Sequence, residues 1–505
     1  MNSTVSLKII KGLYNYKRPY REFAEDESTG SGFVIDIAKG YVVTNAHVVA
    51  DAVSIIGRFI KTGKKDISLE LVGICREKDL ALLKINDSDL SLLSSIENLK
   101  FGDSMFVRQG DKVKALGYQL GSNNIKVTEG VVSGFERFES GDLGREDSIS
   151  RRPGYIQITA AINSSGGPLL NANNEVIGII SSGNKNTGYA IPSRTFLAIY
   201  KELKNGVVKM PTLALDWCRT NREIMKKQTG NSSTYGIYVR KIYPDSCCDV
   251  LEKGDIIRRI DYMDPFWKSN GESNKNVFSL NEKDNKDPAV LVTIFLDRFG
   301  TSTNIGRLKN PVEADETKIN FEKIFTERKL EISEIMDMVP IGAEIMLNIC
   351  RLVDGQPMWY MLKTNYITMP VYRIPYIYPI INPIDYEIFG GMCVTDLSME
   401  ILKGYGIRVD LYERRVIIVQ TFPNTTVYKT DVIREGYIIK SIYAYDKDMV
   451  LIKESHRQLQ SLDDLRSVLK LGGEFLQVNC MDDSTFIFSP SSTEDDLIRR
   501  SYRIS

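Results

Sequence analysis

The chain has 505 residues, more than one hydrophobic core normally supports, so we expect several domains, most simply three. Hydrophobic residues make up 43% and charged residues 26%, which is ordinary for a globular protein and excludes a wholly disordered or collagen-like chain. Because the formal net charge is zero, no overall field attracts nucleic acid or an anionic membrane, and we expect neither as a partner.

The N-terminal segment MNSTVSLKIIKGLYNYKRPY carries lysines, but no apolar run with a small-residue cleavage site follows them. An uninterrupted apolar stretch of about 20 residues, as a membrane-spanning helix needs, is also missing from the sequence. We therefore expect a soluble, intracellular protein without a secretory signal, with cytoplasm and nucleus left open.

The seven cysteines are scattered, odd in number and without a CxxC pair, so we expect free thiols in a reducing compartment, no metal site and no cofactor. The chain has only two histidines, His47 and His456. A reaction that moves a proton near neutral pH therefore has a very short list of candidate bases.

Residues 1–206 alternate short apolar runs with turn residues, as in GSGFVID, GYVVTNAHVV, ISLELVGIC, LALLKI, KVKALGY, YIQITAAI and VIGIISSG. Short strands at this spacing predict an all-β barrel or a pair of sandwiches. A helix should close the unit at SRTFLAIYKELKNG, where apolar residues recur at helical spacing and Gly206 follows as the expected C-cap. We place the first domain boundary there.

A pattern then occurs twice, as EKGDIIRRIDY at 252–262 and REGYIIKSIYA at 434–444. Each copy has a glycine turn leading into a strand, which indicates a duplicated small domain. After the second copy, Ser461 should cap a helix with an apolar face, and EFLQVNC should form a closing strand. This order is typical of a PDZ-like module, and we expect one over 207–368 and a second, atypical one over 369–505.

Polar stretches such as WKSNGESNKN and LNEKDNKDP are expected to be solvated insertions in the first of these modules. The proline-rich segment 369–383 should join the two modules, because its prolines are incompatible with an interior helix or a central strand. The tyrosines of this segment are equally consistent with simple packing.

Three residues of the first domain have the chemistry of a serine hydrolase: a nucleophile, a base and an acid that orients the base. His47 ends an apolar strand in VVTNAHVV, Asp79 precedes another in KDLALLKI, and Ser165 precedes paired glycines in INSSGGPLL. We predict them as the catalytic triad. Ser164 is the alternative nucleophile, but only Ser165 directly precedes the glycines. His456 lies outside any motif and is expected at the surface.

The segments TGSGFVID, GYVVTNAHVV, KDLALLKI, SGGPLLNANNEVIGI and TGYAIPS resemble, in order and spacing, the HtrA/Deg family of trypsin-like serine proteases. The resemblance implies a mainly β chain, with a chymotrypsin-like double β-barrel protease domain followed by two PDZ-like α+β domains, a layout similar to plant-type Deg proteases. It also implies an ATP-independent serine endopeptidase that cleaves unfolded or specific proteins through an acyl-enzyme.

The family resemblance further implies a homotrimer or hexamer assembled through N-terminal aromatic residues. Four residues could serve here, Tyr14, Tyr16, Tyr20 and Phe23, although packing against the barrel would explain them as well.

The segment before the nucleophile departs from the family pattern, which is similar to I-N-P-G-N-S-G-G-P, because this chain is two residues shorter there. The oxyanion loop then consists of Asn163, Ser164 and Ser165, without the glycine whose N–H completes the oxyanion hole. Loss of one such donor costs about 10²–10³-fold in rate. A pseudoprotease, or a PDZ scaffold that binds proteins without cleaving them, is therefore the alternative function.

The resemblance also implies the substrate site. A substrate strand should pair with the edge formed by Ser181, Ser182 and Gly183, and Tyr189 should help to line the primary specificity pocket. No Asp stands at an evident pocket base, so a small or medium apolar side chain is expected there rather than Lys or Arg.

Overall fold

The structure is a computed structural model, and it divides the chain into two compact units. Unit 1 comprises Met1–Ile10, Glu27–Ala50 and Ser54–Val371, and unit 2 comprises Lys11–Asp26, Asp51–Val53 and Tyr372–Ser505. The residues that the structure describes are 2–63, 65–119, 122, 124–136, 154–160, 164–183, 187–209, 213, 215–232, 234–243, 246–265, 277–278, 290–308, 321–325, 329–367, 374–378, 381, 384–407, 409, 413–455, 457–490, 492–502 and 504.

The predicted domain limits after residues 206 and 368 remain predictions, and both lie inside unit 1, the second close to its end at Val371. His456, Asn163 and much of the proline-rich segment 369–383 lie outside the described residues. Within the described ranges, each helix is too short or too polar to span a membrane.

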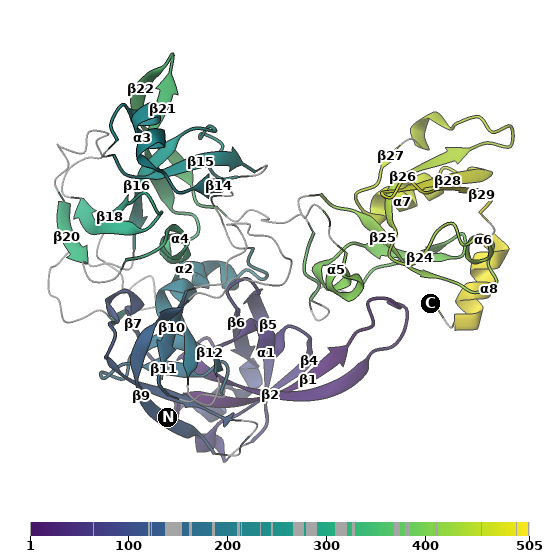
Figure 1. The fold of residues 1–505 in the computed structure, drawn as a ribbon. Helices are drawn as coiled ribbons and strands as arrows, with labels where there is room; N and C mark the ends of the chain where they lie inside the picture. The colour runs from purple at the N-terminus through teal and green to yellow at the C-terminus, as the bar shows by residue number, and fades with distance from the viewer. Residues whose placement is uncertain are drawn as a thin grey trace. The chain divides into compact units, whose positions relative to one another are not determined.

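The first six strands close into a barrel in the order β1-β2-β3-β6-β5-β4 (purple to blue in Figure 1). The apolar residues of LALLKI in barrel strand β6 are all buried, and Lys84 is its one partly exposed residue. The elements of this region are β1 (Thr4–Leu13), β2 (Ala24–Asp36), β3 (Tyr41–Thr44), α1 (Ala46–Val49), β4 (Ala52–Arg58), η1 (Ile60–Thr62), β5 (Ile67–Cys75), β6 (Leu80–Ile85) and η2 (Asp87–Leu93).

A second ring of six strands runs in the order β11-β8-β9-β10-β13-β12 and closes through the pairing of β11 with β12. Two short strands, β7 and β17, extend the sheet beyond β12. The elements are β7 (Phe101–Gly102), η3 (Ser104–Phe106), β8 (Lys112–Gly117), β9 (Lys126–Glu136), β10 (Tyr155–Ile158), β11 (Pro168–Leu170), β12 (Val176–Gly183), β13 (Gly188–Pro192) and β17 (Val277–Phe278). The predicted double β-barrel is confirmed.

The helix predicted to close this region is α2 (Ser193–Leu203), and its apolar residues pack into the core between the barrels. Phe196 stacks on Phe101, with ring centroids 5.2 Å apart. The prediction of Gly206 as the C-cap was wrong by two residues. The helix ends at Leu203 and its C-cap is Lys204, whose backbone is right-handed. Gly206 turns the chain afterwards with φ of +118°.

The remainder of unit 1 is a strongly curved sheet, ordered β14-β15-β16-β18-β19-β20, with β21 pairing to β16 and β22 pairing to β21. Its elements are β14 (Leu215–Cys218), α3 (Arg222–Thr229), β15 (Ile237–Ile242), β16 (Ile256–Asp264), β18 (Val290–Leu296), β19 (Ser302–Leu308), β20 (Phe321–Phe325), α4 (Ile332–Met338), β21 (Glu344–Val353) and β22 (Gln356–Asn365).

A buried ion-pair network joins this sheet to the second barrel within unit 1. Arg194 of α2 binds Asp103 at 2.7 Å and Asp264 of β16 at 2.5 Å, and all three side chains are buried. Met105 of η3 is likewise part of the apolar core of the curved sheet. Buried ion pairs and an apolar contact therefore connect this sheet to the second barrel.

Unit 2 contains a sheet ordered β23-β24-β25-β26-β28-β29, with β27 paired to β26, and several short helices. The elements are β23 (Glu387–Phe389), β24 (Met392–Asp396), α5 (Met399–Tyr405), β25 (Val416–Thr421), α6 (Thr426–Thr430), β26 (Ile438–Tyr445), η7 (Lys453–Ser455), β27 (Arg457–Gln458), α7 (Leu462–Leu469), β28 (Phe475–Cys480), β29 (Thr485–Phe488) and α8 (Ser492–Tyr502).

The sequence repeat corresponds to a repeated local structure. Gly254 before β16 and Gly436 before β26 both have positive φ, +106° and +91°. The N–H of Gly254 donates to the carbonyl of Val239 in β15 at 2.9 Å, and that of Gly436 donates to the carbonyl of Ile418 in β25 at 2.8 Å. The same turn thus starts the equivalent strand in both modules, which supports the duplication predicted from the sequence.

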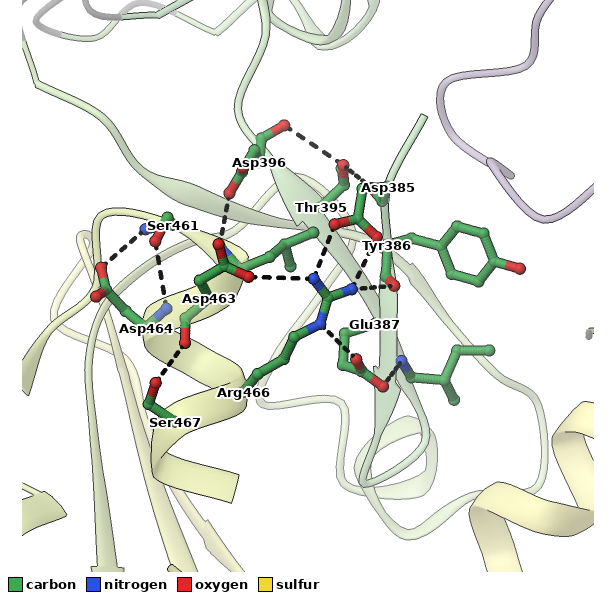
Figure 2. A network of polar contacts seen from close by, with 12 residues as sticks. Asp385, Tyr386, Glu387, Thr395, Asp396, Ser461, Asp463, Asp464, Arg466 and Ser467 are labelled. Carbon is green, nitrogen blue, oxygen red and sulfur yellow. Dashed lines mark hydrogen bonds and ion pairs between the residues drawn. The ribbon is translucent and has the colours of Figure 1, made fainter. Parts of the chain in front are cut away.

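Helix α7 begins as predicted, because Ser461 and Asp464 form a reciprocal capping box. Figure 2 shows that Arg466 on the same helix donates to the carboxylates of Asp385 and Glu387, at 2.7 Å and 3.0 Å. These bonds lower the pKa of Asp385 below its usual range. Helix α7 is therefore tied to the strand that opens the sheet of unit 2.

The N-terminal aromatic residues make contacts within the chain. Tyr14 packs on Phe23, with ring centroids 4.5 Å apart. In unit 2, the hydroxyl of Tyr20 donates to Gln420 at 2.7 Å, and its ring lies 5.8 Å from that of Phe422. The prediction that these aromatics join subunits remains a prediction.

None of the seven cysteines forms a disulfide, and six of them are buried. Burial raises the pKa of the Cys75 thiol well above its usual value. The sulfur atoms of Cys247 and Cys248 lie 3.9 Å apart, within reach of a thiol hydrogen bond, and form no disulfide.

Candidate active site

The register of two barrel strands brings His47 and Asp79 together. In the antiparallel pair β3 and β6, Thr44 lies opposite Ala81. His47 follows Thr44 on the short helix α1, and Asp79 comes two residues before Ala81, so both extend beyond the same end of the pair. The Nδ1 atom of His47 lies 2.8 Å and 2.9 Å from the two carboxylate oxygens of Asp79.

Two further donors hold the Asp79 carboxylate. The backbone N–H of His47 donates to Oδ1 at 2.9 Å, and the hydroxyl of Ser181 donates to Oδ2 at 2.7 Å. Hydrogen bonds to a charged acceptor are short and roughly twice as strong as neutral ones. The carboxylate is therefore fixed from two sides, and its side chain is only 18% exposed while that of His47 is 50% exposed.

The backbone of Asp79 is also constrained, with φ of +54°, an uncommon conformation for a residue other than glycine. Its N–H donates to the carbonyl of Arg76 at 3.2 Å, and its own carbonyl accepts from the side chain of Asn45 at 3.0 Å. The turn that carries the carboxylate is held at several points.

Ser165 lies in a tight turn packed between the two barrels. Its carbonyl accepts from the N–H of Ser31 at 2.8 Å, which ties the turn to β2. Gly166 has φ of +87°, and a Cβ there would lie 2.0 Å from the carbonyl oxygen of Ser31 and 2.4 Å from the hydroxyl of Thr44. A Cβ on Gly167 would lie 2.0 Å from the carbonyl oxygen of Leu116. Both glycines are required because backbone approaches too closely for any side chain.

Ser181 connects Ser165 to the pair formed by His47 and Asp79. Its carbonyl accepts the hydroxyl of Ser165 at 2.8 Å, while its own hydroxyl donates to Asp79. Sequence reasoning predicted Ser181 only as part of the substrate strand and missed this second contact. The structure thus brings all three predicted catalytic residues into one hydrogen-bonded group.

Residues 30–179 match the family described as the trypsin-like peptidase domain. A probable periplasmic serine protease do/HhoA-like of Haemophilus influenzae is 33% identical over 45% of this chain and 48% of its own length. The serine protease Do-like HtrB of Bacillus subtilis is 33% identical over 56% of this chain and 59% of its own. The periplasmic serine endoprotease DegP of Escherichia coli is 33% identical over 45% of this chain and 47% of its own.

Residues 30–179 form a trypsin-like peptidase domain of the HtrA/Deg family. The chain spans about half the length of the curated relatives that it matches. A solved structure, the HtrA-type protease AlgW with decapeptide, is 22% identical over 73% of this chain and 96% of its own, with a TM-score of 0.43. The predicted plant-type layout remains a prediction.

The oxyanion loop of this HtrA/Deg domain is only partly described, because Asn163 lies outside the described residues. Ser164 is buried, and a Cβ on Gly117 would lie 2.5 Å from the Cβ of Ser164. The N–H of Gly166 donates to the carbonyl of Ile180 at 2.8 Å. Gly166 is therefore not an oxyanion donor in this arrangement.

The predicted substrate strand lies at the end of β12. Ser182 pairs with Tyr189 of β13, and Gly183 pairs with Gly188. On the opposite edge of β12, the pairing with β11 ends at Ile179, so among the described residues no strand covers the edge beyond it. The ring of Tyr189 packs edge-on against that of Tyr155, at 6.4 Å between centroids.

Where side chains are described, no group of three or more His, Cys, Asp or Glu residues is arranged to hold a metal ion.

Sequence reasoning also missed Ser31, whose hydroxyl accepts from the N–H of Tyr118 at 2.8 Å and whose carbonyl accepts from Thr44 at 2.7 Å. The sequence feature that could have indicated Ser31 is its position in the motif TGSGFVID, which precedes the strand that leads to His47.

Proposed function

We propose that the protein is a serine endopeptidase that cleaves peptide bonds of unfolded or specific proteins, with Ser165, His47 and Asp79 as its triad. The observation that carries this proposal is the position of Ser181, which bonds to Ser165 through its carbonyl and to Asp79 through its hydroxyl. Ser181 therefore joins the nucleophile to the acid, and the acid in turn bonds to the base His47. The serine protease names of the relatives support the same activity.

The proposed reaction follows from the hydrogen bonds of His47. Because Nδ1 faces the Asp79 carboxylate and donates to it, Nε2 is the basic nitrogen of the neutral ring. Ser165 Oγ forms a bond to the substrate carbonyl carbon as its proton passes to Nε2. That proton then passes to the leaving amine as the C–N bond breaks, which leaves an acyl-enzyme. Water, with His47 again as the base, hydrolyses the ester.

A second candidate, a binding protein without turnover, is favoured by the orientation of the nucleophile. The Ser165 hydroxyl donates to the carbonyl of Ser181 and must rotate about its χ1 bond to donate to His47 instead. Combined with the shortened oxyanion loop, this orientation is consistent with a domain that holds the triad residues but does not react.

Labelling with a fluorophosphonate separates the two functions. A protease should be labelled at Ser165, the label should be absent in Ser165→Ala, and casein hydrolysis should disappear with it. Ser164→Ala, the matched control one residue earlier, should still be labelled. Absence of labelling in the folded wild-type protein would favour the binding protein, and loss of labelling only in Ser164→Ala would move the nucleophile by one residue.

The finer features of the proposal concern the rest of the chain. We propose that Ser182 and Gly183 pair with a substrate strand and that the pocket beside Tyr189 takes a small or medium apolar side chain. The two modules that follow the barrels are proposed to be PDZ-like, and the assembly to be a homotrimer or hexamer.

A further inference from the structure

A buried ion pair adjoins the residue that binds His47. Lys78 immediately precedes Asp79, and its ammonium group pairs with the carboxylate of Asp337. The two side chains are only 7% and 9% exposed. They are 259 residues apart in the sequence, and both belong to unit 1.

Among the described residues, Lys78 is the hydrogen-bond partner found for the Asp337 carboxylate. Asp337 lies on α4 beside the buried apolar residues Ile335, Met336 and Met338. Its second carboxylate oxygen has no hydrogen-bond partner in the described part of the chain. A buried carboxylate with a single partner depends on that partner for compensation of its charge. Asp337 and Lys78 therefore fix each other's position strongly.

The backbone turn at Asp79, the residue after Lys78, needs an anchor of this kind. Asp79 is held at positive φ, and a strained backbone of this kind persists only where its surroundings over-determine it. The bonds from Asn45 and to Arg76 are contacts within the first barrel. The Lys78 side chain is the tether that reaches out of the barrel to α4.

We propose that Asp337 is a positioning residue for the reaction. By anchoring Lys78, it holds the turn of Asp79 so that the carboxylate meets Nδ1 of His47. This inference rests on the proposed function, since it assigns a role to the Asp79 carboxylate in the triad. A misplacement of about 1 Å at a catalytic group costs about 10²-fold in rate.

The competing explanation is that the ion pair merely fastens the curved sheet to the barrels. A matched pair exists for that comparison: Asp264 of β16 binds Arg194 of α2 across the same junction and is fully buried. Arg194 and Asp264 have no place in the hydrogen bonds described for the triad. Asp264→Asn is therefore the control for loss of a buried junction ion pair.

The experiment compares Asp337→Asn with Asp264→Asn in the full chain. In Asp337→Asn we expect kcat to fall about 10²-fold with little change in KM, and the low-field proton signal of His47 Nδ1 to be lost or broadened. With two histidines in the chain, imidazole labelling with nitrogen-15 makes that signal assignable. In Asp264→Asn the unfolding temperature should fall while kcat and the His47 signal are kept.

Two double variants complete the test. The reversed pair, Lys78→Asp with Asp337→Lys, should recover at least tenfold of the lost kcat. If Asp337→Asn does not fold, the apolar pair Lys78→Met with Asp337→Leu keeps the volume and lacks the tether, so it should fold and remain slow. Wild-type kcat together with an unchanged His47 signal in either tether-free variant overturns the proposal. The nuclear magnetic resonance signal needs no turnover, so failure of the proposed function does not hide this result.

Discussion

Substitution of Gly166 by alanine tests whether close packing of the nucleophile turn controls the site. The new Cβ would lie 2.0 Å from the carbonyl oxygen of Ser31, which belongs to the backbone and cannot rotate away. A left-handed conformation costs an L-residue roughly 1–2 kcal/mol. Forced overlap in a packed interior adds about 1–3 kcal/mol. We therefore expect Gly166→Ala to lower the free energy of unfolding of the barrel region by about 2–5 kcal/mol.

The matched control is Gly110→Ala in the turn before β8. Gly110 has nearly the same φ, +91°, but a Cβ there has no atom within 4 Å. Gly110→Ala should therefore lower the free energy of unfolding only by the cost of the left-handed conformation, about 1–2 kcal/mol. The difference between the two variants therefore isolates the close approach to Ser31.

The assay has a stability part and an activity part. Denaturation followed by hydrogen exchange in peptides from β11 and β12 reports the stability of the barrel locally, which avoids treating a multidomain chain as two-state. The rate of fluorophosphonate labelling at Ser165 reports the site and should fall about 10²-fold in Gly166→Ala if the turn moves by about 1 Å. Equal stability and equal labelling rates in the two alanine variants would refute the packing argument.

Two further predictions concern hydrogen bonds to carboxylates. Ser181→Ala removes the hydroxyl that donates to Asp79. Because a hydrogen bond to a charged group contributes about 1.5–3 kcal/mol, kcat/KM for a peptide anilide should fall about 10–100-fold. Unchanged kinetics would contradict the role of this bond. Burial raises the pKa of Asp396, which accepts from the N–H of Leu462 at 2.7 Å, so the folded state holds the proton to higher pH than the unfolded state. The contribution of Asp396 to the stability of the wild type therefore falls as the pH rises from the usual aspartate value to the raised one, whereas Asp396→Asn, which keeps the acceptor, lacks this titration. Denaturation at pH 3 and pH 7 should show the variant gaining stability relative to the wild type at pH 7.

The sequence alone was sufficient for the features that depend on neighbours in the chain. Alternating apolar runs predicted the barrel strands, helical spacing predicted α2, and Ser461 was correctly assigned as the cap of α7. The repeated glycine before β16 and β26 revealed the duplicated turn, because only a residue without Cβ adopts that φ at low cost. The C-cap of α2 was misplaced because helix ends depend on a local choice that several residues satisfy about equally.

The candidate site was predictable to the extent that its residues lie in motifs of fixed spacing. His47, Asp79 and Ser165 each stand beside a strand, and strand register brings His47 to Asp79. The second contact of Ser181 was not predictable, since a serine in a strand is compatible with many partners. Only the fold places its hydroxyl on Asp79.

The tertiary structure alone decided what lies beside the turn of Asp79. Lys78 and Asp337 are separated by 259 residues, and each reads in the sequence as an ordinary surface charge. Their burial follows from the packing of α4 against the barrel turn, a contact between elements that share no sequence pattern. The sequence determined which residues could do the chemistry, whereas long-range packing determined what holds them, because burial and charge compensation depend on atoms far away along the chain.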